Sequence, residues 1–99
     1  MKEIIQQLNQ VFENRIRLAV MSILMVNENT DFNTMKRMLD LTDGNLASHI
    51  ATLEKNNYVT VHKKFVGKKP LTTYSATQSG KRAFMEHINA LEQLIKQTQ

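Results

Sequence analysis

The feature that most limits how this chain can fold is a tight junction between two short amphipathic segments near its middle. The apolar residues of the first segment recur at helical spacing: Phe32, Met35, Met38 and Leu39. They predict a short helix that closes at the turn after Asp40. About three or four connecting residues, 41–44, lead into a second helix. One face of that helix is expected to carry Leu46, Ile50, Leu53 and Asn57. Two helices joined so closely predict a helix-turn-helix.

After Asn57 the spacing of the apolar residues changes from the period of a helix to the period of a strand. Val59, Val61 and Phe65 alternate with polar residues, which indicates a half-buried strand. Residues 67–70, Gly-Lys-Lys-Pro, are typical of a turn, and the β-prone residues 71–76 predict an antiparallel return strand. We therefore expect a β-hairpin directly after the helix-turn-helix.

Helical patterns are also expected at both ends of the chain. An opening helix is predicted from the spacing of Ile4, Ile5, Leu8, Val11 and Phe12. Asn14 is expected to cap a second helix from Arg15 to Val26, and Thr77 a long last helix. The last helix carries an apolar stripe of Phe84, Ile88, Leu91 and Ile95. The predicted fold class is therefore mainly α with a small β-hairpin, in a single domain over residues 1–99.

Composition limits the partners and the compartment. The chain has 99 residues, a net charge of +4 and no cysteine, so disulfides and thiolate metal sites are excluded. A domain of this size buries only about 60% of its unfolded surface, so self-association is expected to add stability. The excess of Lys and Arg suits a polyanionic partner. The start shows no secretory pattern and no apolar stretch is long enough to cross a membrane, so the expected location is cytoplasmic.

The polar residues of the second short helix and of the hairpin fit double-stranded DNA. An α-helix with a small polar outer face can enter the major groove, where each base pair presents distinct donors and acceptors. Lysines at a hairpin turn can neutralise phosphates without reading the sequence. The predicted DNA-binding residues are Thr42, Gly44, Asn45, Ser48, Thr52, Lys55, Lys63, Lys64, Lys68 and Lys69. Asn45, Ser48 and Thr52 are expected to read base edges, and the lysines to contact the backbone or the minor groove.

These segments resemble a known family. Residues 43–50, Asp-Gly-Asn-Leu-Ala-Ser-His-Ile, and 53–59, Leu-Glu-Lys-Asn-Asn-Tyr-Val, look like the recognition helix of winged-helix regulators of the MarR/ArsR-like kind. Residues 65–70 and 73–80 look like that family's wing and last-helix start. The resemblance implies a winged helix-turn-helix and a homodimer on a pseudo-palindromic operator. Two departures stand out: Asn57 replaces a frequent Gly, and no Arg lies at or near Ser48, so sequence preference does not carry over.

Dimerisation through the terminal helices is also expected. Two-fold symmetry is the commonest arrangement of identical subunits, and it would bury the apolar stripe of the last helix. The alternative is that the stripe packs wholly within one subunit. The predicted interface residues are Ile4, Ile5, Leu8, Phe84, Ile88, Leu91 and Ile95.

Other functions receive less support from the sequence. A winged helix can also be a protein-interaction module in a larger assembly, and its mark would be an exposed apolar patch on the DNA-facing side. A small-molecule effector between helices is left open. His49, His62 and His87 lack ligand spacing, so no metal or cofactor is expected and His49 is interpreted as a packing residue. No cysteine nucleophile, phosphate-binding glycine loop or paired carboxylates indicate an enzyme.

Overall fold

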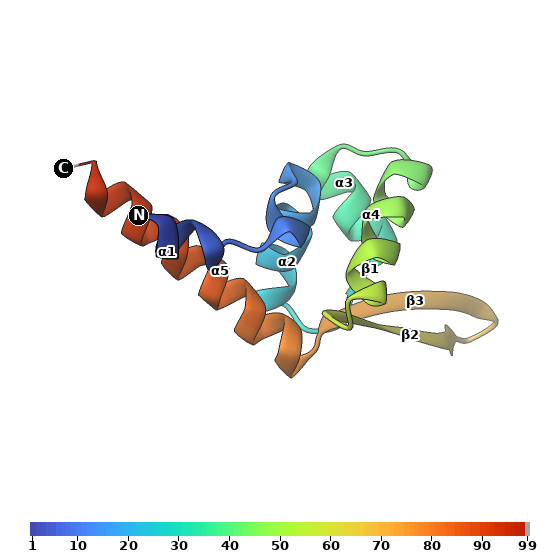
Figure 1. Cartoon of the computed structure of the whole chain (residues 1–99). Helices are drawn as coiled ribbons and strands as arrows, with labels where there is room; N and C mark the ends of the chain where they lie inside the picture. The colour runs from blue at the N-terminus through green and yellow to red at the C-terminus, as the bar shows by residue number, and fades with distance from the viewer. Residues whose placement is uncertain (99) are drawn as a thin grey trace.

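In the computed structural model, which describes residues 1–98, most of the chain is helical and a two-stranded hairpin projects from the body (Figure 1). The elements in chain order are α1 (Lys2–Gln6), the 3-10 helix η1 (Gln10–Phe12), α2 (Arg15–Val26), β1 (Thr30–Asp31), α3 (Phe32–Leu39), α4 (Asp43–Lys55), β2 (Val59–Val66), β3 (Lys69–Ala76) and α5 (Gln78–Gln97). The predicted fold class is confirmed, because helices dominate and the strands form one small antiparallel sheet.

The opening apolar segment is not the single helix that its spacing predicts. Helix α1 ends at Gln6, and η1 begins only at Gln10. Between them the backbone of Asn9 is extended, and its N–H donates to Nδ1 of His87 over 2.9 Å. The side-chain amide of Asn9 donates to the hydroxyl of Tyr58 over 3.0 Å. These bonds reach residues far along the chain and interrupt the helix, an effect that apolar periodicity cannot report.

Side-chain caps begin the helices where the sequence predicts them. Asn14 accepts hydrogen bonds from the backbone nitrogens of Ile16 and Arg17, both over 3.0 Å, so α2 begins at Arg15. The hydroxyl oxygen of Thr77 accepts from the backbone nitrogen of Gly80 over 2.9 Å at the start of α5. Each cap satisfies backbone N–H groups that a helix start leaves without partners. Both predicted caps are confirmed.

The sheet has one strand more than the sequence predicts. Its order is β1-β3-β2, and every pairing is antiparallel. In the two-residue strand β1, Thr30 pairs with Tyr74 and Asp31 with Thr73. Two residues are too few to produce a period, so the alternation that reveals β2 and β3 cannot reveal β1.

The outer half of β2 is exposed, although its alternation predicts a half-buried strand throughout. Val59 is buried and Val61 partly buried, but Phe65 on the same face is 73% exposed. The reason is visible in Figure 1, where the hairpin extends beyond the helical body and no element among residues 1–98 covers its tip. Alternation identifies the two faces of a strand, but burial also requires a neighbouring layer.

Aromatic residues from η1, from α5 and from the connection between α4 and β2 meet in the core. The ring of Phe12 stacks on Tyr58 at a centroid distance of 5.3 Å and meets the edge of Phe84 at 5.5 Å. Phe84 is therefore only 7% exposed within the single chain. This contact explains why η1 is held against α5 and the end of α4, even though η1 is very short.

The first helix and the far half of α5 form an arm that leaves the body on the side opposite the hairpin (Figure 1). The molecule is accordingly elongated, with principal extents of 55 × 26 × 21 Å. Helix α1 packs beside α5 in the arm. We use the name arm for residues 1–8 together with residues 88–98.

Two histidines accept hydrogen bonds inside the fold, and this requires both rings to be neutral. His87, in α5, accepts at Nδ1 from the Asn9 backbone, and His49, in α4, lies with Nδ1 3.1 Å from Nη1 of Arg17. Burial lowers the pKa of His87, against a smaller upward effect of Glu13. Burial and then the charge of Arg17 lower the pKa of His49. The interpretation of His49 as a packing residue with a satisfied nitrogen is confirmed.

A close joint connects the base of the hairpin to α5. Asn57 lies beyond the end of α4 with a φ of 61°, and not on the helical face where its spacing puts it. Asn tolerates this left-handed conformation better than most residues, which suits the position where the resembling family often has Gly. The hydroxyl of Thr77 donates to the Asn57 carbonyl over 2.7 Å, and the Thr77 N–H donates to the Tyr58 carbonyl over 3.0 Å.

Gly80 is required by this joint. A Cβ atom at position 80 would lie 2.2 Å from the carbonyl oxygen of Tyr58 and 2.9 Å from its Cα. Because these are backbone atoms, they cannot move aside as the end of a flexible side chain can. Gly44, by contrast, has no atom within 4 Å of the corresponding position.

We expect Gly80→Ala to lower the free energy of unfolding by about 3 kcal/mol, because the added methyl group overlaps the backbone of Tyr58. Gly44→Ala is the matched control. It adds the same methyl group to a helix with open space around it, and should change stability by less than about 1 kcal/mol, in the stabilising direction. Urea unfolding followed by circular dichroism measures both. Equal stabilities for the two variants would contradict the close approach.

We also expect the protein to lose stability as the pH falls below about 6.5, the ordinary histidine pKa. Since the folded-state pKa of His87 is lowered, the unfolded chain binds more protons in that range. The loss is limited to about 1.4 kcal/mol per pH unit for each histidine. Thermal melts between pH 7.5 and pH 5 measure it, above the range in which Asp31, with its lowered pKa, contributes.

His87→Asn is the informative variant, because an Asn oxygen can replace Nδ1 as the acceptor for the Asn9 N–H but does not titrate. Its melting temperature should depend less on pH than that of the wild type. A wild-type melting temperature that is constant over this range would contradict the prediction.

Candidate functional site

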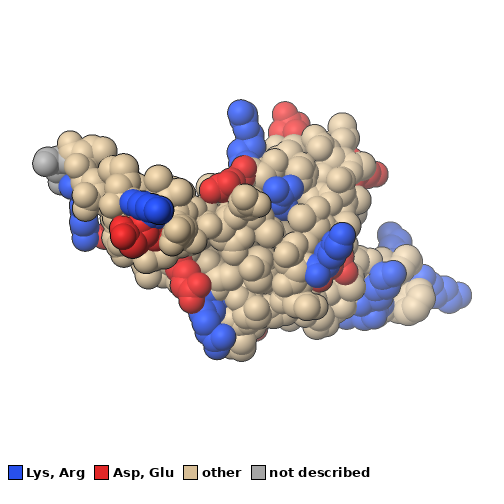
Figure 2. Space-filling model, viewed as in Figure 1, with Lys and Arg blue, Asp and Glu red and all other residues tan. Residues whose placement is uncertain are grey.

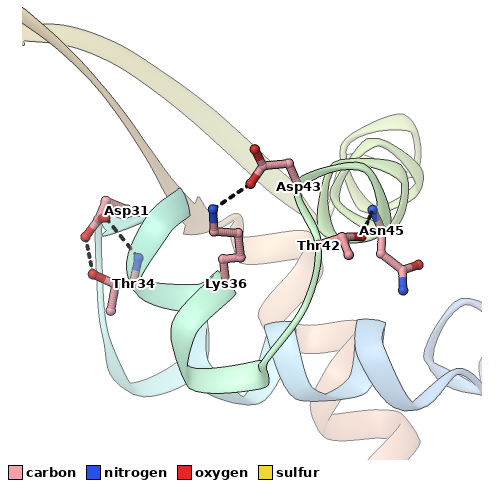
Figure 3. A network of polar contacts seen from close by, with 6 residues as sticks. All are labelled: Asp31, Thr34, Lys36, Thr42, Asp43 and Asn45. Atoms are coloured by element: carbon pink, nitrogen blue, oxygen red, sulfur yellow. Dashed lines mark hydrogen bonds and ion pairs between the residues drawn. The ribbon is translucent and has the colours of Figure 1, made fainter.

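The start of α4 is held by contacts with the preceding helix and turn (Figure 3). The hydroxyl oxygen of Thr42 accepts a hydrogen bond from the backbone nitrogen of Asn45 over 3.2 Å. The ammonium group of Lys36, in α3, lies 2.7 Å from the carboxylate of Asp43. The turn between the helices is closed by Asp40, which adopts the left-handed conformation with a φ of 51°. Together these contacts set the angle at which α4 leaves α3.

The predicted polar face of α4 lies on the outside of the molecule. Gly44, Asn45, Ser48 and Lys55 are exposed, and Thr52 is partly buried. The hydroxyl of Thr52 donates to the Ser48 carbonyl over 3.3 Å, so its oxygen can still accept a hydrogen bond from a ligand. Leu46, Ile50 and Leu53 are buried on the opposite side. The face is therefore available to a partner, and its base-reading role stays a prediction.

The outer face of α4 also carries two exposed alanines that the sequence did not single out as part of the site. Ala47 and Ala51 lie between the polar positions and add no bulk to the outer face. Together with Gly44 and Ser48 they make this surface narrow, which allows the helix axis to come near a partner. Their small size was the available signal, but alanine is common on any helix and so carries little information by itself.

The orientation of α4 is also fixed from inside. Arg17, in α2, donates from Nε to the Val11 carbonyl over 2.6 Å, and its Nη1 reaches His49 in α4. The guanidinium group thus connects η1, α2 and α4 through one side chain. A rigid helix is what a reading surface requires, since each base contact depends on the placement of the helix axis.

The hairpin places its lysines on different faces. Gly67, with a φ of 64°, opens the turn, and Val66 pairs with Lys69. Successive residues of a strand point to opposite sides. Lys63 therefore shares a face with Phe65, whereas Lys64 and Lys69 share the other face with Val66. The four hairpin lysines, which the sequence predicts as one group, therefore do not all point to the same side of the hairpin.

Positive charge gathers at the outer end of the hairpin, as the blue side chains beyond the helical body show in Figure 2. Lys63, Lys64, Lys68 and Lys69 are all exposed, and no acidic residue occurs from position 55 to position 85. The hairpin therefore lies in a stretch of chain without negative charge, which begins at the last residue of α4.

The predicted interface residues divide into two groups. Ile5 and Ile95 are 54% and 59% exposed in the arm, and Ile4, Leu8, Ile88 and Leu91 are partly buried there. Phe84 instead packs against Phe12 in the core of the chain. Its spacing puts Phe84 on the stripe, but α5 passes from the body into the arm along its length. Phe84 therefore lies on the body side, and we do not include it in the proposed dimer interface.

A polar hollow of about 680 Å³ lies where the arm meets the body. Its lining is mostly amide side chains, among them Gln6, Gln10, Asn56 and Gln93, together with Tyr58 and Glu86. Neutral amides of this kind donate and accept hydrogen bonds without selecting a charge. Within residues 1–98, no three His, Asp or Glu side chains are grouped so that they could hold a metal ion. In the same part of the chain, no helix has the length and apolarity needed to cross a membrane.

Comparison with known proteins places these features in a family. Residues 16–95 match the winged helix DNA-binding domain. An uncharacterised protein of Methanocaldococcus jannaschii is 32% identical over 87 residues, which cover 88% of this chain and 95% of the relative. The matched residues include both α4 and the hairpin.

Solved structures agree with this result. A transcriptional regulator homologue from Pyrococcus horikoshii is 31% identical, with a TM-score of 0.86 over 98% of this chain and 94% of that chain. MepR of S. aureus, solved in complex with DNA, has the same fold with a TM-score of 0.75 over 98% of this chain and 82% of its own, at 13% identity. The family and the fold are those of DNA-binding transcriptional regulators and not those of enzymes.

Proposed function

Because the chain belongs to the winged helix DNA-binding family, we propose that it is a homodimeric transcriptional regulator that reads its operator with α4. The observation that carries this proposal is the exposed face of α4, which has small polar side chains and stands beside a hairpin rich in lysine. We also propose a cytoplasmic location, because a regulator must share a compartment with the DNA that it binds.

In this proposal α4 enters the major groove and the hairpin follows the neighbouring backbone or minor groove. Asn45, Ser48 and Thr52 read base edges through their amide and hydroxyl groups. Lys55, one turn further, contacts phosphate. Thr42 and Gly44, at the helix start, approach a phosphate where backbone N–H groups and the helix dipole favour an anion. The lysines at positions 63, 64, 68 and 69 add contacts that neutralise charge.

The proposed dimer forms through the arm. Exposed isoleucines on a projecting helix pair are costly in water, and a two-fold axis would bury both copies at once. The two copies of α4 would then enter successive major grooves about 34 Å apart. The rival function, a protein-interaction module, calls for an exposed apolar patch on the outer face of α4, where this chain has polar and small residues instead.

We expect Ser48→Ala to weaken binding to a duplex selected by the protein from a random pool, but not to an unrelated duplex. Loss of one base contact costs about 1–3 kcal/mol on the matching sequence alone. Titration of both labelled duplexes by fluorescence anisotropy measures the difference. An equal loss on both duplexes would show that Ser48 does not read a base.

The double substitution Lys68→Ala with Lys69→Ala is the control for a contact that does not read sequence. It should weaken binding to both duplexes alike and reduce the slope of log K against log salt by about 2, one for each phosphate contact. An unchanged slope would remove the hairpin tip from the interface.

We expect Ile95→Glu to weaken the dimer about tenfold or more, because the substitution buries a charge in the proposed interface. Met38→Glu is the matched control, since Met38 is 60% exposed, as Ile95 nearly is, but lies on α3. Sedimentation equilibrium without DNA measures the association of both. A wild-type monomer at all concentrations, or an equal effect of the two substitutions, would exclude the arm as the interface.

A further inference from the structure

The hairpin tip carries two apolar side chains that the fold leaves uncovered. Phe65 is 73% exposed and Val66 61% exposed, and both lie among the four exposed lysines. Neither residue packs into the core, because the hairpin extends beyond the helical body (Figure 1). A large aromatic ring in water is unfavourable, and lysines at the same place attract a polyanion.

The pairing of the strands separates the two side chains. Phe65 pairs with Pro70, on the same face as Val59 and Val61, which cover the core. Val66 pairs with Lys69 on the opposite face. The face of Phe65 therefore continues, beyond the body, the face on which the helices pack. Phe65 therefore lies on the core-facing side of the hairpin, beyond the body, and Val66 lies on the other side.

We propose that Phe65 is an apolar wedge that enters the minor groove of the bound duplex at a flexible pyrimidine–purine step and bends the DNA. This inference rests on the proposed function. Apolar side chains that enter the minor groove partly unstack a base step and kink the duplex. Such steps deform most easily, so a contact of this kind also selects sequence without a hydrogen bond to a base.

The surrounding residues favour DNA over the other occupants of an exposed apolar tip. Lys63 lies on the same face as Phe65, two residues away, and so brings a positive charge beside the ring. Phe65 and Val66 lie on opposite faces and do not form a joint patch. A membrane or a second copy of the chain would favour such a patch, whereas a wedge between two base pairs needs one ring.

The test uses a duplex of about 30 base pairs, selected from a random pool by the wild-type protein and labelled at its two ends with donor and acceptor dyes. Binding of the wild type should raise energy transfer between the ends. Phe65→Ala should bind about three- to tenfold more weakly, with energy transfer near that of the free duplex. Its salt slope should equal that of the wild type, because all four lysines remain.

Two variants make the result specific to apolar bulk at position 65. Val66→Ala removes another exposed apolar side chain from the opposite face and should bend the duplex as the wild type does. Phe65→Leu keeps apolar bulk and should retain most of the bending, since Leu also acts as a wedge. Thermal melts should show that all three variants are folded, because neither residue is buried.

Several outcomes would overturn the wedge. They are full bending by Phe65→Ala, an equal loss in Phe65→Ala and Val66→Ala, or a wild type that binds without bending the duplex. Binding to vesicles of phosphatidylserine that depends on Phe65, with unchanged DNA bending, would assign the ring to a lipid surface instead. A wild type that binds no duplex even at low salt would reject the proposed function itself.

Discussion

The joint between the hairpin base and α5 is the constraint on which the rest of the structure depends. Here the end of α4, the first residue of β2 and the start of α5 meet within a few residues. Thr77 donates from its hydroxyl to the Asn57 carbonyl and from its backbone to the Tyr58 carbonyl. Gly80 allows the two backbones to approach so closely. As a result, the hairpin leaves the body at a set angle to α4, while α5 leaves in the opposite direction.

The two halves of the candidate site differ in how firmly they are held. Helix α4 is fixed by its buried apolar side, by Arg17 at His49 and by Lys36 at Asp43. The outer hairpin has only its own ladder of hydrogen bonds between β2 and β3. A rigid helix suits contacts that need exact placement of donors and acceptors, whereas a projecting hairpin can adjust to a charged backbone. This difference agrees with the division between base contacts and phosphate contacts proposed for the two elements.

The segments that lead into the arm are held to the core by an aromatic contact and by hydrogen bonds. Phe12 packs between Tyr58 and Phe84, and the adjacent Asn9 bonds to His87 and Tyr58. The amide-lined hollow lies at this same meeting point. These contacts lie in the body of the protomer, between the arm and the base of the hairpin.

The sequence by itself determined most of the local structure. Asn14 and Thr77 mark helix starts because a side chain near the backbone can satisfy its free N–H groups without help from the rest of the chain. Alternation gave the two long strands, and small polar residues gave the outer face of α4. Each of these features is encoded within a few neighbouring residues, and the combination was specific enough for the winged-helix resemblance.

Only the tertiary structure decided which elements end, pair or become buried through contacts with distant residues. It broke the first helix at Asn9, paired β1 with β3, buried Phe84 in the core and left Phe65 exposed. The first three depend on residues far away in the sequence: His87 bonds to Asn9, Tyr74 pairs with β1, and Phe12 packs on Phe84. Phe65 is exposed because no layer within residues 1–98 covers it. Periodicity states which side of an element is apolar. It cannot state which other element lies against that side, because that depends on how the whole chain is packed.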